Sequence, residues 1–294
     1  MALLGSTLTL SRQFKCSEEE FRRLADFIYR LLGIRIDERR RYLVENRLSS
    51  RLGALGLKGF GEYVEYLRFG EDRRGEIDRL AEAITTNETS LFRDTVQLDI
   101  FRDKILVPLI AEKTKAGRKT LRIWSAGCSS GEEPYTLAIM VAEALRASLI
   151  QWDVRISGSD ISLAVLEQAK AARYGAYAIR TTPPAMLQRW FTSAEEGFYA
   201  VRPELRKLVQ FDRVNLNDPA AMKRVQRSDV IFCRNVIIYF DDDMRKRVVS
   251  GFYDNLNPGG HLVLGHSETL KGITATMLPV PGLGTPIYRK ASER

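Results

Sequence analysis

The first third of the chain carries apolar residues at helical spacing. Apolar side chains recur every three or four positions between residues 21 and 32, directly after Ser17 and Glu20, which have the spacing of a capping box. Gly33 is typical of the residue that ends such a helix. The same periodicity predicts further helices over residues 37–52, 60–69 and 74–84. Residues 1–84 are therefore expected to form an all-α domain.

A strand-like pattern replaces this one from about residue 120. Short, continuous apolar runs alternate with helical segments, and the expected strands cover residues 121–125, 154–159, 209–214 and 230–233. A last strand pair is expected at residues 261–265 and 286–289. Strands that alternate with helices favour a parallel sheet covered on both faces, so residues 120–294 are expected to form an α/β domain. Residues 85–119 are expected to connect the two domains.

One region interrupts the alternation of strands and helices. Residues 181–213 begin near Pro183-Pro184 and contain two short apolar stretches, at 198–201 and 208–211, which a charged turn joins. We therefore expect a small, partly antiparallel β insertion within the α/β domain.

Net charge and cysteine content narrow the partners and the compartment. The chain of 294 residues has a net charge of +8, which suits nucleic acid, an anionic membrane surface or an acidic protein as a partner. Three widely spaced cysteines are more typical of reduced thiols in a cytoplasm than of disulfides. Two histidines are too few for a histidine-rich centre, so no metal is expected. No apolar run approaches the roughly 18 residues that membrane insertion requires.

The most informative segment covers residues 125–135, where a strand leads through small residues into a helix. Small residues such as Ala126 and Gly127 let the backbone approach a nucleotide-like ligand closely. Glu133, with Glu132 before it, would oppose the phosphates of a dinucleotide and suits a cationic ligand, such as the sulfonium of S-adenosylmethionine. An ordinary turn with two solvated glutamates is the alternative interpretation.

Polar residues also follow other expected strands. Asp160 comes directly after the strand at 154–159, where it can accept the hydroxyls of a ribose or cap the next helix. Arg234 and Asn235 lie at the carboxyl end of a buried strand, where unpaired burial would cost about 1–3 kcal/mol each. Their partners are therefore either a ligand or a structural hydrogen-bond network. Residues 85–94 form a further polar cluster, which by itself is typical of a loop with a helix cap.

Together these segments resemble the chemotaxis receptor methyltransferase (CheR) family over nearly the whole chain. The resemblance rests on six segments in order, namely residues 85–93, 125–135, 159–160, 214–216, 232–240 and 265–268. It implies a cytoplasmic enzyme with an all-α N-terminal domain and a Rossmann-like class I methyltransferase domain that bears a small antiparallel β-subdomain. Members of the family transfer a methyl group from S-adenosylmethionine to glutamates of methyl-accepting chemotaxis receptors and release S-adenosylhomocysteine. Leu91 departs from the pattern, since many members have an aromatic pair before the arginine.

The resemblance also implies roles for single residues. The methionine part of the cofactor is expected to lie among Asn87, Thr89, Arg93 and Glu133, next to the cofactor-binding turn at Ala126 and Gly127. Asp160 would bind the ribose, and the adenosine would be surrounded by Asn215, Leu216, Asn235 and Val236. Arg93 and Tyr239 are the expected catalytic residues near the incoming carboxylate.

The chemistry of glutamate methylation agrees with this set of residues. A glutamate with a pKa of about 4.3 is already ionised at neutral pH, so no general base is required. The enzyme must align the carboxylate with the methyl group, and Arg93 can hold one carboxylate oxygen by a charge-assisted hydrogen bond.

Two surfaces are expected to meet the cytoplasmic domain of the receptor. Arg40, Arg47 and Arg51 fall on one side of the helix at 37–52, where they would either dock the acidic methylation helices or form a solvated face. In some members of the family, the β-subdomain binds a C-terminal pentapeptide of the receptor by strand addition. Residues 191–197 are short and lack the glycine-rich loop of those members, so pentapeptide dependence is not expected.

Two other functions share some of these features. A nucleic-acid methyltransferase would fit the basic charge, but the sequence lacks a base-stacking aromatic platform beside Asn235 and an N-P-P-Y type of signature. No nucleic acid is therefore expected as a partner. A sensor or scaffold that binds S-adenosylmethionine without turnover would need the cofactor residues, but it would have no rate to lose when Arg93 is replaced.

Overall fold

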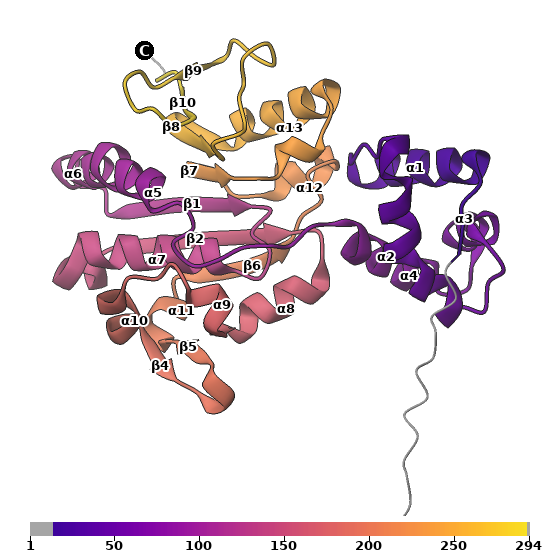
Figure 1. Ribbon diagram of the computed structural model, residues 1–294. Coiled ribbons are helices and arrows are strands. Elements are labelled where there is room, and N and C mark those ends of the chain that lie inside the picture. Colours follow the sequence, from indigo (N-terminus) through magenta and orange to yellow (C-terminus); the bar gives the residue numbers. More distant parts are fainter. Residues whose placement is uncertain (1–13, 293–294) are drawn as a thin grey trace, which may run out of the picture. The chain divides into compact units, whose positions relative to one another are not determined.

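The computed structural model describes residues 14–292, and the chain divides into two compact units between Thr85 and Thr86 (Figure 1). The first unit corresponds to the expected all-α domain of residues 1–84, whose first 13 residues lie outside the described part. The second unit contains the expected α/β domain and, apart from Thr85, the expected connecting segment.

The described part of the first unit is built from helices. These are α1 (Glu18–Leu32), α2 (Arg41–Ala54), α3 (Phe60–Phe69) and α4 (Arg73–Ile84), with a 3-10 turn at Glu38–Arg40 before α2. The capping box of α1 is present, because Ser17 Oγ accepts the N–H of Glu20 and the Glu20 carboxylate accepts the N–H of Ser17. Gly33 ends α1 with a φ of 72°, which glycine adopts without strain.

The second unit contains a seven-stranded sheet with the strand order β6-β2-β1-β7-β8-β10-β9. Its strands are β1 (Thr120–Ala126), β2 (Asp153–Asp160), β6 (Val209–Arg213), β7 (Ser228–Cys233), β8 (Leu256–Leu264), β9 (Met277–Pro279) and β10 (Ile287–Lys290). The strands from β6 to β8 are parallel, whereas β10 pairs antiparallel with both β8 and β9. The predicted α/β class is confirmed.

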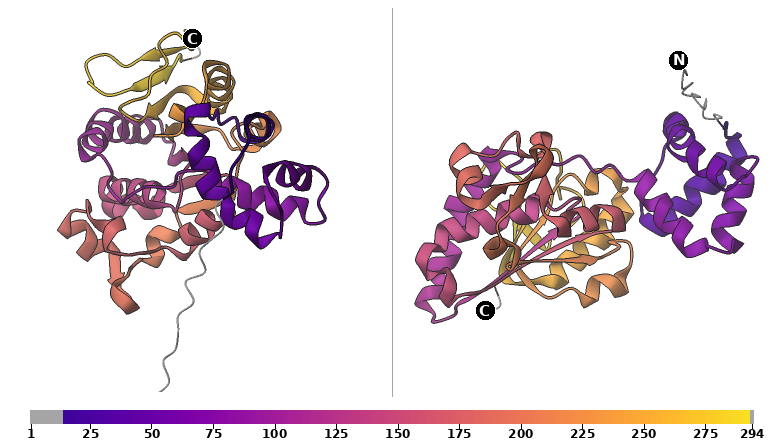
Figure 2. Two further views of the ribbon diagram at one scale, coloured as in Figure 1. Left: turned by 45° about the vertical axis from the view of Figure 1, so that its right-hand side comes forward. Right: turned by 90° about the horizontal axis from the view of Figure 1, so that it is seen from below.

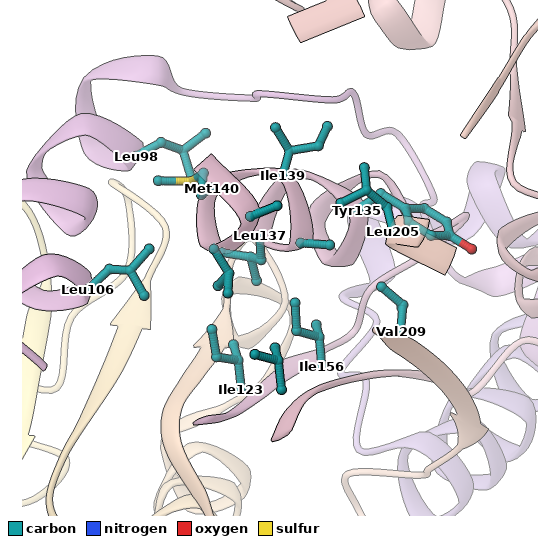
Figure 3. Packing of buried hydrophobic residues seen from close by; sticks show 14 of the residues in the cluster. Leu98, Leu106, Ile123, Tyr135, Leu137, Ile139, Met140, Ile156, Leu205 and Val209 are labelled. Atoms are coloured by element: carbon teal, nitrogen blue, oxygen red, sulfur yellow. The ribbon is translucent and has the colours of Figure 1, made fainter. Parts of the chain in front are cut away.

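Helices cover both faces of this sheet. They are α5 (Thr95–Phe101), α6 (Val107–Lys115), α7 (Glu132–Leu145), α8 (Leu163–Ala171), α12 (Pro219–Arg224) and α13 (Asp242–Asn255), and a π-helical turn at Arg102–Leu106 joins α5 to α6. Ile123 of β1 packs with Ile156, Val209 and Leu137 in the buried cluster beneath α7 (Figure 3). The next residue, Trp124, points to the other face, where its ring lies 5.4 Å from that of Phe252 on α13.

The strand order places the expected ligand-binding edge. In the sheet, β1 lies between β2 and β7. The chain continues from β1 to β2 and β6 on one side and then crosses to β7 and β8 on the other, so the carboxyl end of β1 is a topological switch point. Open α/β sheets bind ligands outside the carboxyl ends of the strands at such a switch point. The turns that follow β1, β2, β6 and β7 all lie at that edge because these strands are parallel.

A second, three-stranded antiparallel sheet has the order β3-β5-β4. It consists of β3 (Arg173–Tyr174), β4 (Phe191–Ser193) and β5 (Tyr199–Val201), with the short helices α9 (Ala176–Ile179), α10 (Pro184–Trp190) and α11 (Pro203–Arg206). In Figure 1 and the left view of Figure 2, this small sheet and the C-terminal pair β9–β10 lie at opposite ends of the second unit.

The bounds of this insertion differ from the expected residues 181–213. The small sheet already includes Arg173–Tyr174, and Val209–Arg213 belongs to the large sheet, where it pairs in parallel with β2. The physical reason is that a two-residue strand has no periodicity of its own, and that β6 completes the edge of the large sheet beside β2.

No helix among residues 14–292 combines the length and the apolar character that crossing a membrane requires.

Candidate active site

The turn after β1 brings two predicted parts of the site into contact. Gly127, Ser129 and Gly131 have φ values of 74°, 51° and 89°, which fold the chain back tightly before α7 begins. A Cβ on Gly127 would lie only 2.5 Å from Cγ2 of Val236, which follows β7. Glycine is therefore required for the turns after β1 and β7 to approach each other.

Asp160 ends β2 and contacts the turn after β1. One carboxylate oxygen accepts the N–H of Ser129 at 2.9 Å, and the other accepts the N–H of Ser162 at 3.0 Å. The side chain is buried, and burial raises the pKa of its carboxyl group. α8 is capped by Ser162 rather than by Asp160, so the expected alternative of a helix cap does not hold for Asp160. Each carboxylate oxygen keeps a lone pair that can accept a ribose hydroxyl.

The loop before α5 is anchored to the same turn and to α7. Ser129 Oγ donates to the carbonyl of Asn87 at 2.9 Å, and the N–H of Phe92 donates to Thr136 Oγ1 of α7 at 2.9 Å. Asp94 caps α5 by accepting the N–H of Gln97, which agrees with the expected loop and helix cap. The segment that carries Asn87, Thr89 and Arg93 thus has a fixed path beside the glycine turn.

Arg234 is a site residue that the sequence alone did not assign. Its side chain is only 5% exposed, and its guanidinium lies 3.2 Å from Glu133 Oε2, 2.8 Å from the carbonyl of Arg93 and 3.5 Å from Asp94 Oδ2. The second Glu133 oxygen accepts the hydroxyl of Ser125 at 2.7 Å. Of the two expected explanations for a polar residue at this strand end, the hydrogen-bond network holds for Arg234.

This pairing bears on the charge argument made for Glu133. The charge of Glu133 is expected to suit a cationic ligand rather than phosphates, and Arg234 offsets part of that charge. The charge of the site therefore depends on three carboxylates, Glu133, Asp94 and Asp160, and on the one guanidinium of Arg234, which pairs with both Glu133 and Asp94. In the sequence, the apolar run around Arg234 shows that this polar side chain needs a partner, but it does not show which residue the partner is.

The remaining predicted residues follow the ends of β6 and β7. Asn215 accepts the N–H of Asn217 at 2.9 Å, which fixes the turn that also carries Leu216. Asn235 has a φ of 61°, and Tyr239 lies half-buried on a 3-10 turn at Ile237–Tyr239. The topology places these turns on the same sheet edge as Asp160, while their contacts with a cofactor stay predictions.

The three predicted docking arginines differ in their contacts within the first unit. Arg51 forms two hydrogen bonds, of 2.6 Å and 3.0 Å, with the buried carboxylate of Glu76. Arg47 donates to the carbonyl of Ile84 at 2.7 Å, at the carboxyl end of α4. Arg40 is exposed in the turn before α2. A receptor can therefore approach Arg40 and Arg47 more easily than Arg51.

An open cavity of about 420 Å³ lies elsewhere in the second unit. It is lined by Tyr135, Lys170, Pro203, Arg206, Lys207, Val209 and Phe211. None of these is a predicted cofactor residue, and we place the site at the carboxyl edge of the sheet because the turns, acids and glycines converge there.

Within residues 14–292, no group of three or more His, Cys, Asp or Glu side chains is placed to hold a metal ion. The three cysteines, Cys16, Cys128 and Cys233, are buried free thiols. Burial raises the pKa of Cys128 and Cys233 well above the ordinary value, so neither is an activated nucleophile.

The parallel sheet, the glycine turn and the acid at the end of β2 are typical of α/β proteins that bind a nucleoside-containing ligand. Residues 87–282 match the family described as "CheR methyltransferase, SAM binding domain", and residues 19–85 match "CheR methyltransferase, all-alpha domain". The chain is therefore an S-adenosylmethionine-dependent methyltransferase, and it belongs to the CheR methyltransferase family.

Similar proteins carry the same kind of name. Chemotaxis protein methyltransferase 2 of Vibrio cholerae is 36% identical over 259 residues, which cover 88% of each chain. Chemotaxis protein methyltransferase of Borreliella burgdorferi is 36% identical and covers 87% of this chain and 90% of its own. Chemotaxis protein methyltransferase 1 of Pseudomonas aeruginosa is 37% identical, with 84% of this chain and 89% of its own covered. The chain thus acts in methylation within chemotaxis.

The residues at the sheet edge fit S-adenosylmethionine in three respects. Gly127 leaves no side chain between the turn and a ligand, and Asp160 offers a buried acceptor for ribose hydroxyls. The acids Glu133, Asp94 and Asp160 suit a ligand with a positive sulfonium rather than one with phosphates.

Proposed function

We propose that this enzyme methylates glutamate side chains on the cytoplasmic helices of a methyl-accepting chemotaxis receptor. The observation that carries the proposal is the placement of Arg93 on an anchored loop beside Glu133 and Arg234, within a family whose relatives are named chemotaxis protein methyltransferases. The cofactor, when bound, supplies an electrophilic methyl group. We further propose that Asn87, Thr89, Arg93, Ala126, Gly127, Glu133, Asp160, Asn215, Leu216, Asn235 and Val236 hold it.

The chain's own residues bind and orient the acceptor. Arg234 holds the carbonyl of Arg93, and Arg93 Nη1 donates to the carbonyl of Glu88 at 3.0 Å. Within residues 14–292 the other guanidinium N–H groups of Arg93 donate to no protein atom, so they can hold one oxygen of the substrate carboxylate. The second oxygen of that carboxylate then faces the methyl group. A carboxylate is ionised at neutral pH, so no proton has to be removed. Tyr239 is proposed to lie beside this carboxylate.

The test is a methylation assay with the full-length protein. Labelled S-adenosylmethionine and receptor cytoplasmic helices should yield a base-labile methyl ester. Arg93→Ala should lower the rate about 100-fold, because a charge-assisted contact made to the reacting carboxylate is lost. S-adenosylhomocysteine affinity, measured by isothermal titration calorimetry, should fall far less.

Arg155→Ala is the matched control, since Arg155 is an exposed arginine on β2 that pairs with Asp153. Its rate should equal that of the wild type. If the wild type binds S-adenosylhomocysteine but forms no ester with any acidic receptor helix, glutamate methylation is wrong and a sensor without turnover is favoured.

Two details of receptor recognition belong to the same proposal. Arg40, Arg47 and Arg51 are proposed to dock the acidic methylation helices, with the largest share from Arg40 because it is exposed. The strands of the small sheet have two or three residues each, which leaves few backbone groups for an added strand. This supports methylation that does not depend on a receptor pentapeptide. The buried free thiols support action in the cytoplasm.

A further inference from the structure

Residues 265–268 follow β8 and have no role in the reaction described above. Glu268 is the last of them, and this residue is only 4% exposed. Its Oε2 accepts the N–H groups of Gly265 and Asn235, at 2.7 Å and 2.8 Å. Its Oε1 accepts those of Val236 and Ile238, at 2.9 Å and 3.3 Å. One carboxylate therefore collects four backbone donors, and three of them belong to the turn after β7.

The backbone of this turn has the form of an anion-binding nest. Asn235 lies in the left-handed region with a φ of 61°, and Val236 is right-handed, with a φ of −117° and a ψ of −50°. Such an alternation points successive N–H groups towards one side, where an anion can bind them together. Asparagine is one of the non-glycine residues that visit this region, but a loop that can also adopt other conformations needs a contact that selects this one. Glu268 provides that contact.

Close packing connects the same turn to two glycines. A Cβ on Gly265 would lie 2.9 Å from Glu268 Oε2 and 3.0 Å from the Asn235 nitrogen. On the other side, Val236 is the residue that a Cβ on Gly127 would meet at 2.5 Å. A shift of the turn after β7 would therefore displace the glycine turn after β1 as well.

We propose that Glu268 is a positioning residue for the cofactor site. It fixes the turn that carries Asn235 and Val236 in the conformation that receives the adenosine. It also fills the nest with the chain's own carboxylate, so that a ligand phosphate is excluded from this part of the sheet edge. The inference rests on the proposed function in one respect, namely the assignment of the adenosine to these two residues.

The experiment compares Glu268→Gln with a matched control in the full-length protein. Both Glu268 oxygens accept N–H groups, so either orientation of the glutamine amide places its NH₂ against two donors. We expect S-adenosylhomocysteine affinity, measured by isothermal titration calorimetry, to fall at least about tenfold. Asp229→Asn is the control, because Asp229 is a buried carboxylate at the other end of β7 that accepts the N–H of Arg122 at 2.9 Å.

If Glu268 only stabilised the fold, its replacement would lower the thermal stability without a specific loss of S-adenosylhomocysteine affinity. Thermal unfolding midpoints of both variants are therefore measured alongside the affinities. At a similar loss of thermal stability, Asp229→Asn should retain S-adenosylhomocysteine affinity within about twofold. If Glu268→Gln does not fold, Glu268→Asp takes its place, since it keeps the charge but is too short to reach all four donors.

Asn235→Ala separates the two ways in which the inference can fail. If Asn235→Ala weakens S-adenosylhomocysteine binding while Glu268→Gln binds like the wild type, the positioning role is wrong and the adenosine assignment holds. If Asn235→Ala itself binds like the wild type, the adenosine assignment is wrong and the inference falls with it. Weakening by both variants, but not by Asp229→Asn, is the result we expect.

Discussion

The Arg51 guanidinium is held by a carboxylate that has no access to solvent. Glu76 is fully buried, and it accepts hydrogen bonds from Arg51 at 2.6 Å and 3.0 Å and from the hydroxyl of Tyr63 at 2.8 Å. Burial and the neighbouring Glu76 raise the pKa of the Tyr63 hydroxyl, which therefore stays a neutral donor. Arg79 approaches the same carboxylate at 3.5 Å. Arg51 thus has a structural task that is independent of any receptor.

Because Arg51 pairs with a buried carboxylate whereas Arg40 is exposed, their replacement should affect different properties, namely stability and receptor binding. Arg51→Met should lower the free energy of unfolding by about 2–4 kcal/mol in urea titrations, because it leaves a buried charge with weaker partners. Arg40→Glu should change the unfolding free energy by less than about 0.5 kcal/mol, since Arg40 is exposed. Its KM for receptor helices should rise about fivefold through like-charge repulsion. An unchanged KM in Arg40→Glu would remove this residue from the docking surface.

Single residues were predictable where their partners are close in sequence. The cap of α1 depends on Ser17, Glu20 and Gly33, which lie within one helix and its ends. Arg234, by contrast, contacts Glu133 and the carbonyl of Arg93 across 101 and 141 positions. Its place in a buried apolar run showed that it needs a partner, but only the folded sheet selects which one.

At the scale of elements, β8 carries an unusual histidine. Burial, and to a lesser degree the charge of Arg289, lower the pKa of His261 from 6.5 to about 4. His261 pairs with Val230 of β7 and with Arg289 of β10, so it lies inside the large sheet. The folded protein therefore holds this imidazole neutral under conditions where the unfolded chain would protonate it.

The pH dependence of stability follows from this shift. Above about pH 6.5 the histidine is neutral in both states, and its contribution to stability is fully present. As the pH falls from 6.5 towards 4, only the unfolded chain binds the proton, so stability is lost. Between pH 7 and pH 5 we expect His261 to account for about 1–2 kcal/mol of the decrease in unfolding free energy. In urea titrations at both pH values, the decrease in unfolding free energy from pH 7 to pH 5 should be smaller in His261→Gln than in the wild type by this amount. Parallel pH profiles of the two proteins would contradict this account.

Elements were predictable in proportion to their length. The long helices α1, α3 and α4 and the buried strands β1, β2 and β7 have enough residues for a clear period. β3 has two residues, and only its antiparallel pairing with Tyr199 and Ala200 makes it a strand. β6 was expected as a strand, but the sequence did not show which strand it pairs with, because its partner β2 lies about fifty positions earlier in the chain.

At the scale of the whole molecule, electrostatic attraction by the basic chain and binding of the cofactor depend on different features. The net charge of +8 is a property of the whole chain and acts over the screening length of the solution, which is about 10 Å at 0.1 M salt. The proposed cofactor site depends instead on short contacts, such as those of Asp160 with Ser129 and Ser162. The candidate site could be anticipated because the family's segments converge on one sheet edge, whereas the contacts that fix it required the fold.

Salt should therefore separate receptor docking from cofactor binding. Raising NaCl from about 50 mM to about 400 mM should increase the KM for acidic receptor helices about five- to tenfold, since exposed charges are screened. The affinity for S-adenosylhomocysteine should change by less than about twofold, because its partly buried contacts are screened much less. Binding to random duplex DNA in the same series measures the basic charge alone. If DNA binding were tight at about 200 mM salt, or if the receptor KM did not respond to salt, the charge would have to serve a partner other than acidic receptor helices.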